Sequence, residues 1–120
     1  MKRYLPGVLL LLIVACTNYN EEELYAQKTE ELCVIGNVSY LTDIKPILQR
    51  ECYSCHITAI KSGNIILDTY EGVKAATEHP LLPAITHEPG HTPMPQGGNK
   101  LPACDIAKIR KWIEAGTLNN

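Results

Sequence analysis

The chain has 120 residues, a length that favours a single domain. It contains 45% hydrophobic and 20% charged residues, a composition that is typical of a folded protein and excludes a wholly disordered one. The 11 Lys and Arg side chains are outnumbered by 13 Asp and Glu, whereas a nucleic-acid-binding protein would carry a basic excess, so no nucleic-acid partner is expected. With no Phe, one Trp and five Cys, the chain has little aromatic material for a core, and we expect a cofactor, a metal or disulfides to complete its interior.

Residues 1–15 have the pattern of an export signal. Lys2 and Arg3 precede the unbroken apolar run 8–15, VLLLLIVA. This run is far shorter than the roughly 20 apolar residues of a membrane-spanning helix, and it matches the apolar region of a secretory signal peptide. The sequence therefore predicts a signal peptide over 1–15 and an exported protein.

The cysteine that follows predicts a lipid anchor. Ile13-Val14-Ala15-Cys16 resembles the bacterial lipobox, in which the cysteine carries acyl chains and becomes the first residue of the mature protein. A plain signal peptide or a short uncleaved anchor is the alternative. Each buried acyl CH₂ contributes about 0.8 kcal/mol, so several chains on Cys16 would hold the protein to a bacterial membrane, facing the periplasm or the cell surface.

A polar segment separates this anchor from the rest of the chain. Residues 17–31 read TNYNEEELYAQKTEE and hold the acidic surplus of the chain. Such a composition cannot bury enough apolar surface to fold, so we expect an acidic tether over 16–32 and a folded domain over 33–120.

The folded domain is predicted to begin with a helix. Thr42 or Asp43 can cap a helix that runs to about Glu51, and Pro46 is tolerated only near its first turn. Three apolar residues with helical spacing would form its buried face, namely Ile44, Ile47 and Leu48.

The motif C-x-x-C-H follows this helix, as Cys52-Tyr53-Ser54-Cys55-His56. It is the attachment motif of c-type haem. Two thiols three positions apart on a helical turn can form thioethers with the two vinyl groups of one porphyrin, and the adjacent imidazole then lies over the iron. The motif therefore predicts Cys52 and Cys55 as attachment points and His56 as the proximal ligand.

Two other kinds of functional site also contain a C-x-x-C pattern. A zinc ribbon needs a second closely spaced pair, whereas Cys33 and Cys104 stand alone in the sequence. A redox C-x-x-C typically lies in a βαβ unit and has no use for the histidine that follows. Haem is favoured because it is attached outside the cytoplasm, where this chain is expected to be exported.

A second short helix and a long loop are predicted after the motif. Asp68 or Thr69 can cap a helix over 70–76. The loop from His79 to Leu101 contains five prolines, namely Pro80, Pro83, Pro89, Pro93 and Pro95.

Met94 lies in this loop and is the single methionine besides Met1. Pro93 and Pro95 fix φ on either side of it, so we expect a stiff, extended segment that can run close past a haem face. Its thioether is the predicted distal iron ligand. His87 and His91 in the same loop are the competing ligands, and a core-filling role for Met94 is the simpler alternative.

The last predicted helix spans about 103–115, with Pro102 at its start and Gly116 past its end. Its apolar stripe consists of Ile106, Ile109, Trp112 and Ile113. Two cysteines are then left, Cys33 and Cys104. In an oxidising compartment they form either a disulfide or two free buried thiols.

Over about residues 40–120 the chain resembles the small monohaem class I cytochrome c lipoproteins of Bacteroidota and planctomycetes. The matching segments are YLTDIKPIL at 40–48, CYSCH at 52–56, GNIILDTY at 63–70, PMP at 93–95, Lys100-Leu101 and IRKWIEAG at 109–116. The resemblance implies an all-α cytochrome c-like domain of three to five short helices around one covalently attached haem c. It also implies His56 and Met94 as axial ligands and a disulfide between Cys33 and Cys104.

Electron transfer, with no catalysis by this chain, is the activity that the resemblance implies. The partners would be redox proteins, such as a dehydrogenase, an oxidase or other cytochromes. The alternatives are an electron-accepting subunit of a dehydrogenase complex, and a haem sensor or peroxidase-like protein with an open distal iron site beside His87 or His91. A zinc-stabilised lipoprotein that uses Cys33, Cys52, Cys55 and Cys104 is the structural alternative.

Overall fold

The computed structural model describes residue 33 and residues 35–120. The predicted signal peptide over 1–15, the lipidated Cys16 and the tether over 16–32 therefore lie outside the described residues. The described part of the chain is helical and contains no strand, in agreement with the predicted all-α class. None of the helices in this part is both long enough and apolar enough to cross a membrane.

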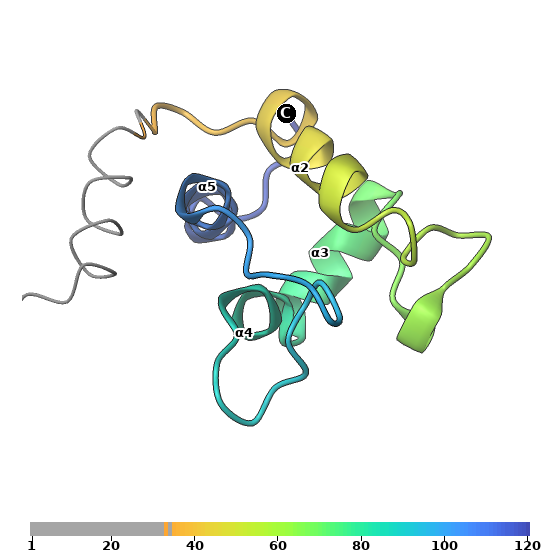
Figure 1. Cartoon of the computed structure of the whole chain (residues 1–120). Helices are drawn as coiled ribbons and strands as arrows, with labels where there is room; N and C mark the ends of the chain where they lie inside the picture. The colour runs from red at the N-terminus through yellow and green to blue at the C-terminus, as the bar shows by residue number, and fades with distance from the viewer. Residues whose placement is uncertain (1–32, 34) are drawn as a thin grey trace, which may run out of the picture.

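The first helical segment begins earlier than the sequence predicts. A π-helical turn, η1 (Tyr40–Ile44), runs directly into α2 (Lys45–Glu51), as Figure 1 shows. The predicted N-cap is wrong, because Ser39 holds this position and the Asp43 carboxylate accepts a hydrogen bond from its N–H at 3.0 Å. Pro46 explains the wide turn: it has no N–H for an α-helical bond, and its ring crowds the carbonyl four residues before it.

The second predicted helix is confirmed as α3 (Tyr70–Glu78), two residues longer than expected. Thr69 caps it and accepts a hydrogen bond from the Gly72 N–H at 3.1 Å. Gly72 is required by packing, since a Cβ there would clash with the carbonyl oxygen of Ile66. The loop before α3, which includes the short helix η2 (Ser62–Asn64), can therefore lie close against it.

A helix that the sequence analysis missed, α4 (Leu81–Thr86), lies inside the predicted loop 79–101. The prolines around it suggested a loop, but Pro80 is its N-cap and Pro83 lies in its first turn, where a missing N–H costs no helical hydrogen bond. The apolar spacing of Leu81 and Ile85 was the available signal, and Ile85 is buried.

The last helix is confirmed as α5 (Ala103–Glu114), with Pro102 as its N-cap. It ends before Gly116, whose φ of 90° is a conformation that glycine adopts without steric cost. Ile109 and Trp112 of the predicted stripe are buried, and the other two members, Ile106 and Ile113, pack at the edge of the core.

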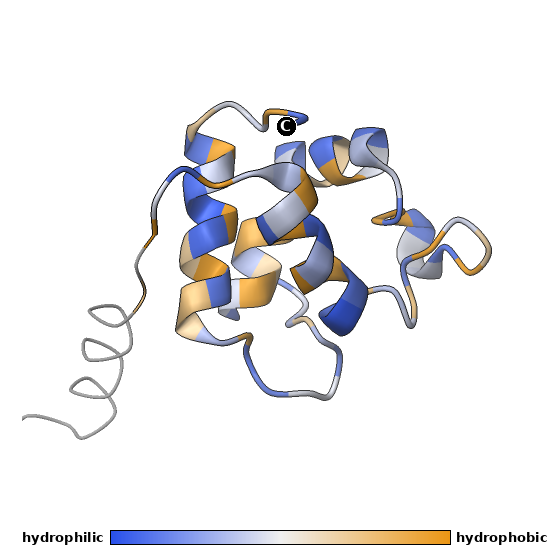
Figure 2. Ribbon diagram, turned by 90° about the horizontal axis from the view of Figure 1, so that it is seen from above, coloured by the Kyte–Doolittle hydropathy of each residue, from blue (hydrophilic) through white to orange (hydrophobic). Residues whose placement is uncertain are grey.

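The core lies where α5 packs against η1 and α4, while α3 packs against α4 (Figure 1). The Tyr40 ring lies between the rings of Tyr70 and Trp112, at centroid distances of 5.2 and 5.5 Å. Trp112 is fully buried, and its indole N–H donates to the Leu118 carbonyl at 2.8 Å. Figure 2 shows hydrophobic and hydrophilic residues alternating along the helices, the pattern of amphipathic helices around a common core.

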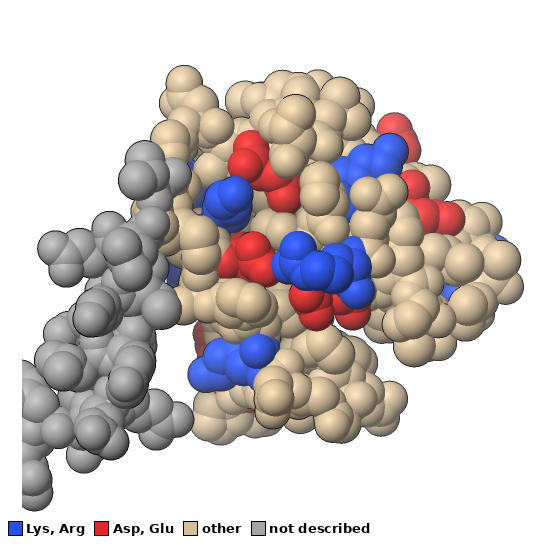
Figure 3. Space-filling model, turned by 45° about the horizontal axis from the view of Figure 1, so that its top comes forward, with Lys and Arg blue, Asp and Glu red and all other residues tan. Residues whose placement is uncertain are grey.

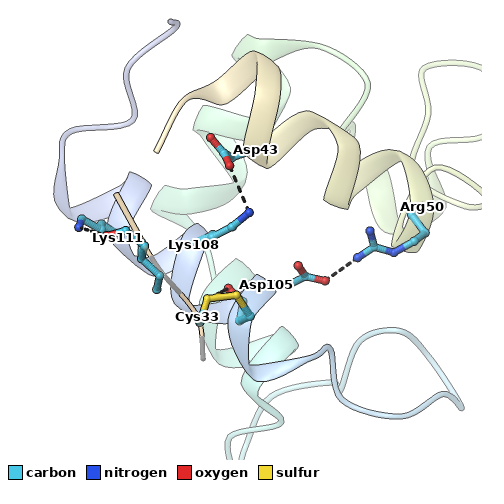
Figure 4. Close-up of a disulfide and its surroundings, with 8 residues drawn as sticks. Cys33, Asp43, Arg50, Asp105, Lys108 and Lys111 are labelled. Atoms are coloured by element: carbon cyan, nitrogen blue, oxygen red, sulfur yellow. Dashed lines mark hydrogen bonds and ion pairs between the residues drawn. A yellow bond between two sulfur atoms is a disulfide. The ribbon is translucent and has the colours of Figure 1, made fainter. Parts of the chain in front are cut away.

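Covalent and ionic links join the start of the domain to α5, as Figure 4 shows. The structure pairs Cys33 with Cys104 as a disulfide, with their Cα atoms 5.6 Å apart. Two ion pairs, Lys108 with Asp43 and Asp105 with Arg50, connect α5 to the first helical segment. Exposed pairs of this kind contribute about 0–1 kcal/mol each, so the disulfide is the stronger link.

Candidate haem site

A cavity of about 550 Å³ opens between the end of α2, α3, α4 and the segment that leads into α5. Its volume lies in the range of roughly 300–1,000 Å³ that is usual for cofactor sites. All four residues that the sequence assigned to haem line it, namely Cys52, Cys55, His56 and Met94. The fold therefore brings the C-x-x-C-H motif and the predicted distal ligand to one cavity.

The motif itself is a helical turn fixed by backbone hydrogen bonds. The Cys52 N–H donates to the Leu48 carbonyl at 2.8 Å, so the turn continues α2. The Cys52 carbonyl accepts from the N–H groups of Cys55 and His56, at 3.1 and 3.0 Å. The Leu67 N–H donates to the His56 carbonyl at 2.7 Å and ties the turn to the loop before α3. These bonds hold the motif in the helical spacing that two-point attachment needs.

The polar groups of this turn fit a covalently bound haem. Cys52 and Cys55 are both free thiols, and burial, with a smaller contribution from the charge of Glu51, raises the pKa of Cys52 to about 11. The His56 Nδ1 and the Tyr53 hydroxyl are buried without a hydrogen-bond partner among the described residues. Buried unpaired polar atoms are rare in native proteins, and of these two residues His56 lines the cavity. Two free thiols and an adjacent imidazole are the groups that attach a c-type haem and bind its iron.

The rest of the cavity wall is mostly apolar. Its apolar part includes side chains from the loop before α3, from α3 and α4, and from the segment before α5: Ile65, Leu67, Ala76, Leu81, Ala84, Ile85 and Leu101. Helix α4, absent from the sequence prediction, contributes three of them. An apolar wall excludes water and suits the hydrophobic faces of a porphyrin.

Met94 is half-buried and is held by its main chain. Its N–H donates to the Ala84 carbonyl at 3.0 Å, and its carbonyl lies 3.0 Å from Nε2 of His87. The segment is not extended as predicted. It bends at Met94 and turns directly afterwards, where the Gly98 N–H donates to the Pro95 carbonyl at 3.0 Å. The prolines restrict the backbone of this segment, and the hydrogen bonds to Ala84 and His87 fix its position against α4.

The two competing histidines have different positions. His91 is exposed and lines the cavity, whereas His87 does not line it and contacts the Met94 carbonyl instead. His79, at the start of the predicted loop, also lines the cavity and is exposed.

The alternative zinc site is not formed. Its four sulfurs would have to converge, but Cys33 and Cys104 pair with each other and neither lines the cavity. Within residues 33 and 35–120, no group of three or more His, Cys, Asp or Glu side chains is arranged to hold a metal ion. A haem iron needs a different set, because the porphyrin contributes four nitrogens and the chain only two axial ligands.

Comparison of the chain with protein-family models, with curated proteins and with solved structures gave no match. The assignment of the cavity is therefore argued from the residues that line it.

Proposed function

We propose that residues 33–120 form a c-type cytochrome domain that carries single electrons. One observation carries this proposal: two free thiols, an imidazole and a thioether, from two separate segments, line a single cavity. In the proposed site, Cys52 and Cys55 would hold haem c covalently, and His56 and Met94 would bind its iron. When bound, haem supplies a one-electron couple between Fe(III) and Fe(II).

The roles of the residues follow from this ligand set. The two thioether bonds hold the cofactor in a domain whose core is small. His56 and Met94 would both bind the iron, which would leave no iron site for a substrate, so the proposed role is that of a carrier and not of an enzyme. A thioether ligand and an apolar wall both raise the reduction potential, because they favour the less charged ferrous state.

The proposed setting is the surface of a bacterial membrane. The signal peptide and Cys16 predict export and lipid anchoring, which would keep the carrier close to redox partners outside the cytoplasm. The resemblance to small monohaem cytochrome c lipoproteins supports the same assignment. An electron-accepting subunit of a dehydrogenase complex would use this same site and differ only in its partner.

The position of His91 favours a haem sensor or peroxidase-like protein as the alternative function. Because it lines the cavity, it could serve as a distal polar group in a sensor or peroxidase-like protein whose iron is not bound by Met94. The two functions differ in one measurable property, since a carrier with two filled axial positions resists carbon monoxide and a sensor binds it.

The first test is covalent haem attachment. The full chain, produced in bacteria that mature c-type cytochromes, should retain a haem stain on a denaturing gel and show the mass of one added haem. The Cys52→Ala/Cys55→Ala variant should lose both signals. The matched control Cys33→Ala/Cys104→Ala, which also removes two cysteines, should keep both signals. A colourless mature wild-type protein with the mass of acylated apoprotein would refute the proposal.

The second test is a redox titration followed by optical spectroscopy. A one-electron transition, an absorption band in the red that reports a thioether–iron bond in the ferric state, and slow carbon monoxide binding in the ferrous state are expected of a carrier. Rapid binding of the gas without the red band would favour the sensor.

A further inference from the structure

His87 closes the C-terminal end of α4 in a conformation that is uncommon for a residue with a side chain. Its φ of 57° and ψ of 42° are left-handed helical values. The His87 N–H donates to the Ala84 carbonyl at 3.3 Å, and the Glu88 N–H donates to the Pro83 carbonyl at 2.9 Å. The backbone there reverses direction, and histidine is among the few residues enriched in such positions. Without a role for its side chain, the usual residue at this position would be glycine.

The side chain of His87 has a specific contact. Its Nε2 lies 3.0 Å from the carbonyl oxygen of Met94, and a carbonyl only accepts, so Nε2 carries the hydrogen. The N–H of Met94 donates at the same time to Ala84, at 3.0 Å. Both polar groups of the Met94 main chain are thus bound to one short stretch at the end of α4.

We infer that His87 is the positioning residue of Met94. This inference rests on the proposed function and deepens it. By holding the Met94 carbonyl, His87 restricts the conformations that the loop can take when the thioether leaves the iron, and it thereby favours the ligated state. His87 does not line the cavity, so it acts through the ligand and not on the iron.

The size of the effect follows from the free energy of one hydrogen bond. A typical net contribution corresponds to about a three- to tenfold change in an equilibrium constant. Loss of the His87 contact should therefore raise the population with Met94 dissociated about three- to tenfold. Carbon monoxide, which binds the ferrous iron only in that population, should bind faster by the same factor.

Three variants of the haem-loaded chain test the inference. His87→Leu removes the donor at similar volume, and His87→Gln keeps an N–H donor at similar reach. Glu88→Gln is the control, because the exposed Glu88 follows His87 in the chain but neither lines the cavity nor contacts the Met94 carbonyl. His87→Leu should bind carbon monoxide about three- to tenfold faster and show a weaker red band, with haem content and helical circular dichroism unchanged. His87→Gln should bind carbon monoxide at the wild-type rate, and Glu88→Gln should not change this rate.

The outcomes separate this inference from the proposed function. If the wild-type protein lacks haem or the red band, the proposed function fails. If the wild-type protein has both and His87→Leu binds the gas at the wild-type rate, only the role of His87 is refuted. If His87→Leu does not fold, nuclear magnetic resonance of the ferrous wild-type protein decides. A slowly exchanging His87 Nε2–H coupled to the Met94 carbonyl supports the inference, and a rapidly exchanging one overturns it.

Discussion

Met94 and His56 reach the same cavity by different kinds of support. The turn that carries His56 is held by bonds within the motif and to Leu48 and Leu67. Met94 is held almost entirely by α4, through Ala84 and His87. The proximal side of the proposed site is therefore local in sequence, whereas the distal side depends on a neighbouring helix. A distal ligand held in this way is the one expected to dissociate first.

Replacement of Met94 by Ala should remove the distal ligand. We expect loss of the red band, rapid binding of carbon monoxide and a reduction potential lower by on the order of 100 mV, within the range of about 0.8 V that axial ligands span. Optical redox titration measures the band and the potential, and mixing the ferrous protein with carbon monoxide measures the rate of gas binding. His91→Ala is the matched control, because His91 lines the same cavity. An unchanged spectrum in Met94→Ala would show that another residue is the ligand.

Helices α2 and α4 show how proline acts at the level of an element. Pro46 lies inside one continuous helical segment because the turn before it widens into η1. Pro80 and Pro83 lie at the start of α4, where the first N–H groups have no partner in any helix. Counting prolines predicted a loop over 79–101, but the positions of the prolines relative to the helix start decide the outcome.

Asp43 links the first helical segment to α5, and its titration should be measurable. The Ser39 N–H and, to a smaller extent, Lys108 hold the pKa of the Asp43 carboxyl below its ordinary value. At a given acidic pH, the Asp43 carboxyl therefore binds more protons in the unfolded chain than in the folded one. Its contribution to the stability of the folded protein is complete above the pKa of about 3.9 that an Asp has in an unfolded chain. This contribution is lost as the pH falls through the pKa of Asp43 in the folded protein.

Asp43→Asn should therefore lower the free energy of unfolding by about 1 kcal/mol at pH 7, a value that allows for solvent screening. The difference from wild type should vanish as the pH falls from about 5 toward 2. Urea denaturation at a series of pH values measures it. Glu78→Gln, at an exposed position on α3, is the control and should show little difference. A constant difference between Asp43→Asn and wild type across this range would contradict the assignment.

On the scale of the whole molecule, the two ends of the described domain meet. The N–H groups of Tyr40 and Leu41 donate to Asn120, and the disulfide joins Cys33 to α5. Basic and acidic side chains are interspersed on the face shown in Figure 3, several of them in contact. The residues of the disulfide and of the bonds to Asn120 do not line the cavity, so stability and haem chemistry should be separable.

Cys33→Ser/Cys104→Ser tests this separation. The disulfide spans 71 residues, and the chain-entropy model gives an upper value of about 4 kcal/mol for its removal. Haem content and spectrum should not change. Denaturant titration measures stability, and mass spectrometry under non-reducing conditions verifies the bond in the wild-type protein. Free thiols at both positions, or an unaltered stability of the variant, would contradict the structure.

Cys16→Ser tests the proposed membrane anchor. The variant should appear in the soluble fraction after cell lysis, because the acyl chains that supply the membrane affinity are absent. Fractionation followed by haem staining measures this shift. A variant with a lowered stability but an intact Cys16, such as Asp43→Asn, is the control and should stay with the membrane. Retention of Cys16→Ser at the membrane would argue against lipidation.

The sequence by itself determined the features that depend on neighbouring residues. The motif at 52–56, the helix α3 with its Thr69 cap and the helix α5 ending before Gly116 are such features, because spacing, capping and chain geometry act over a few residues. Only the tertiary structure decided how distant segments meet. It formed α4 within the proline-rich segment, brought Met94 and the motif to one cavity, gave His91 and His87 different surroundings and paired Cys33 with Cys104. These outcomes depend on packing and hydrogen bonds between residues far apart in the chain, which local patterns do not encode.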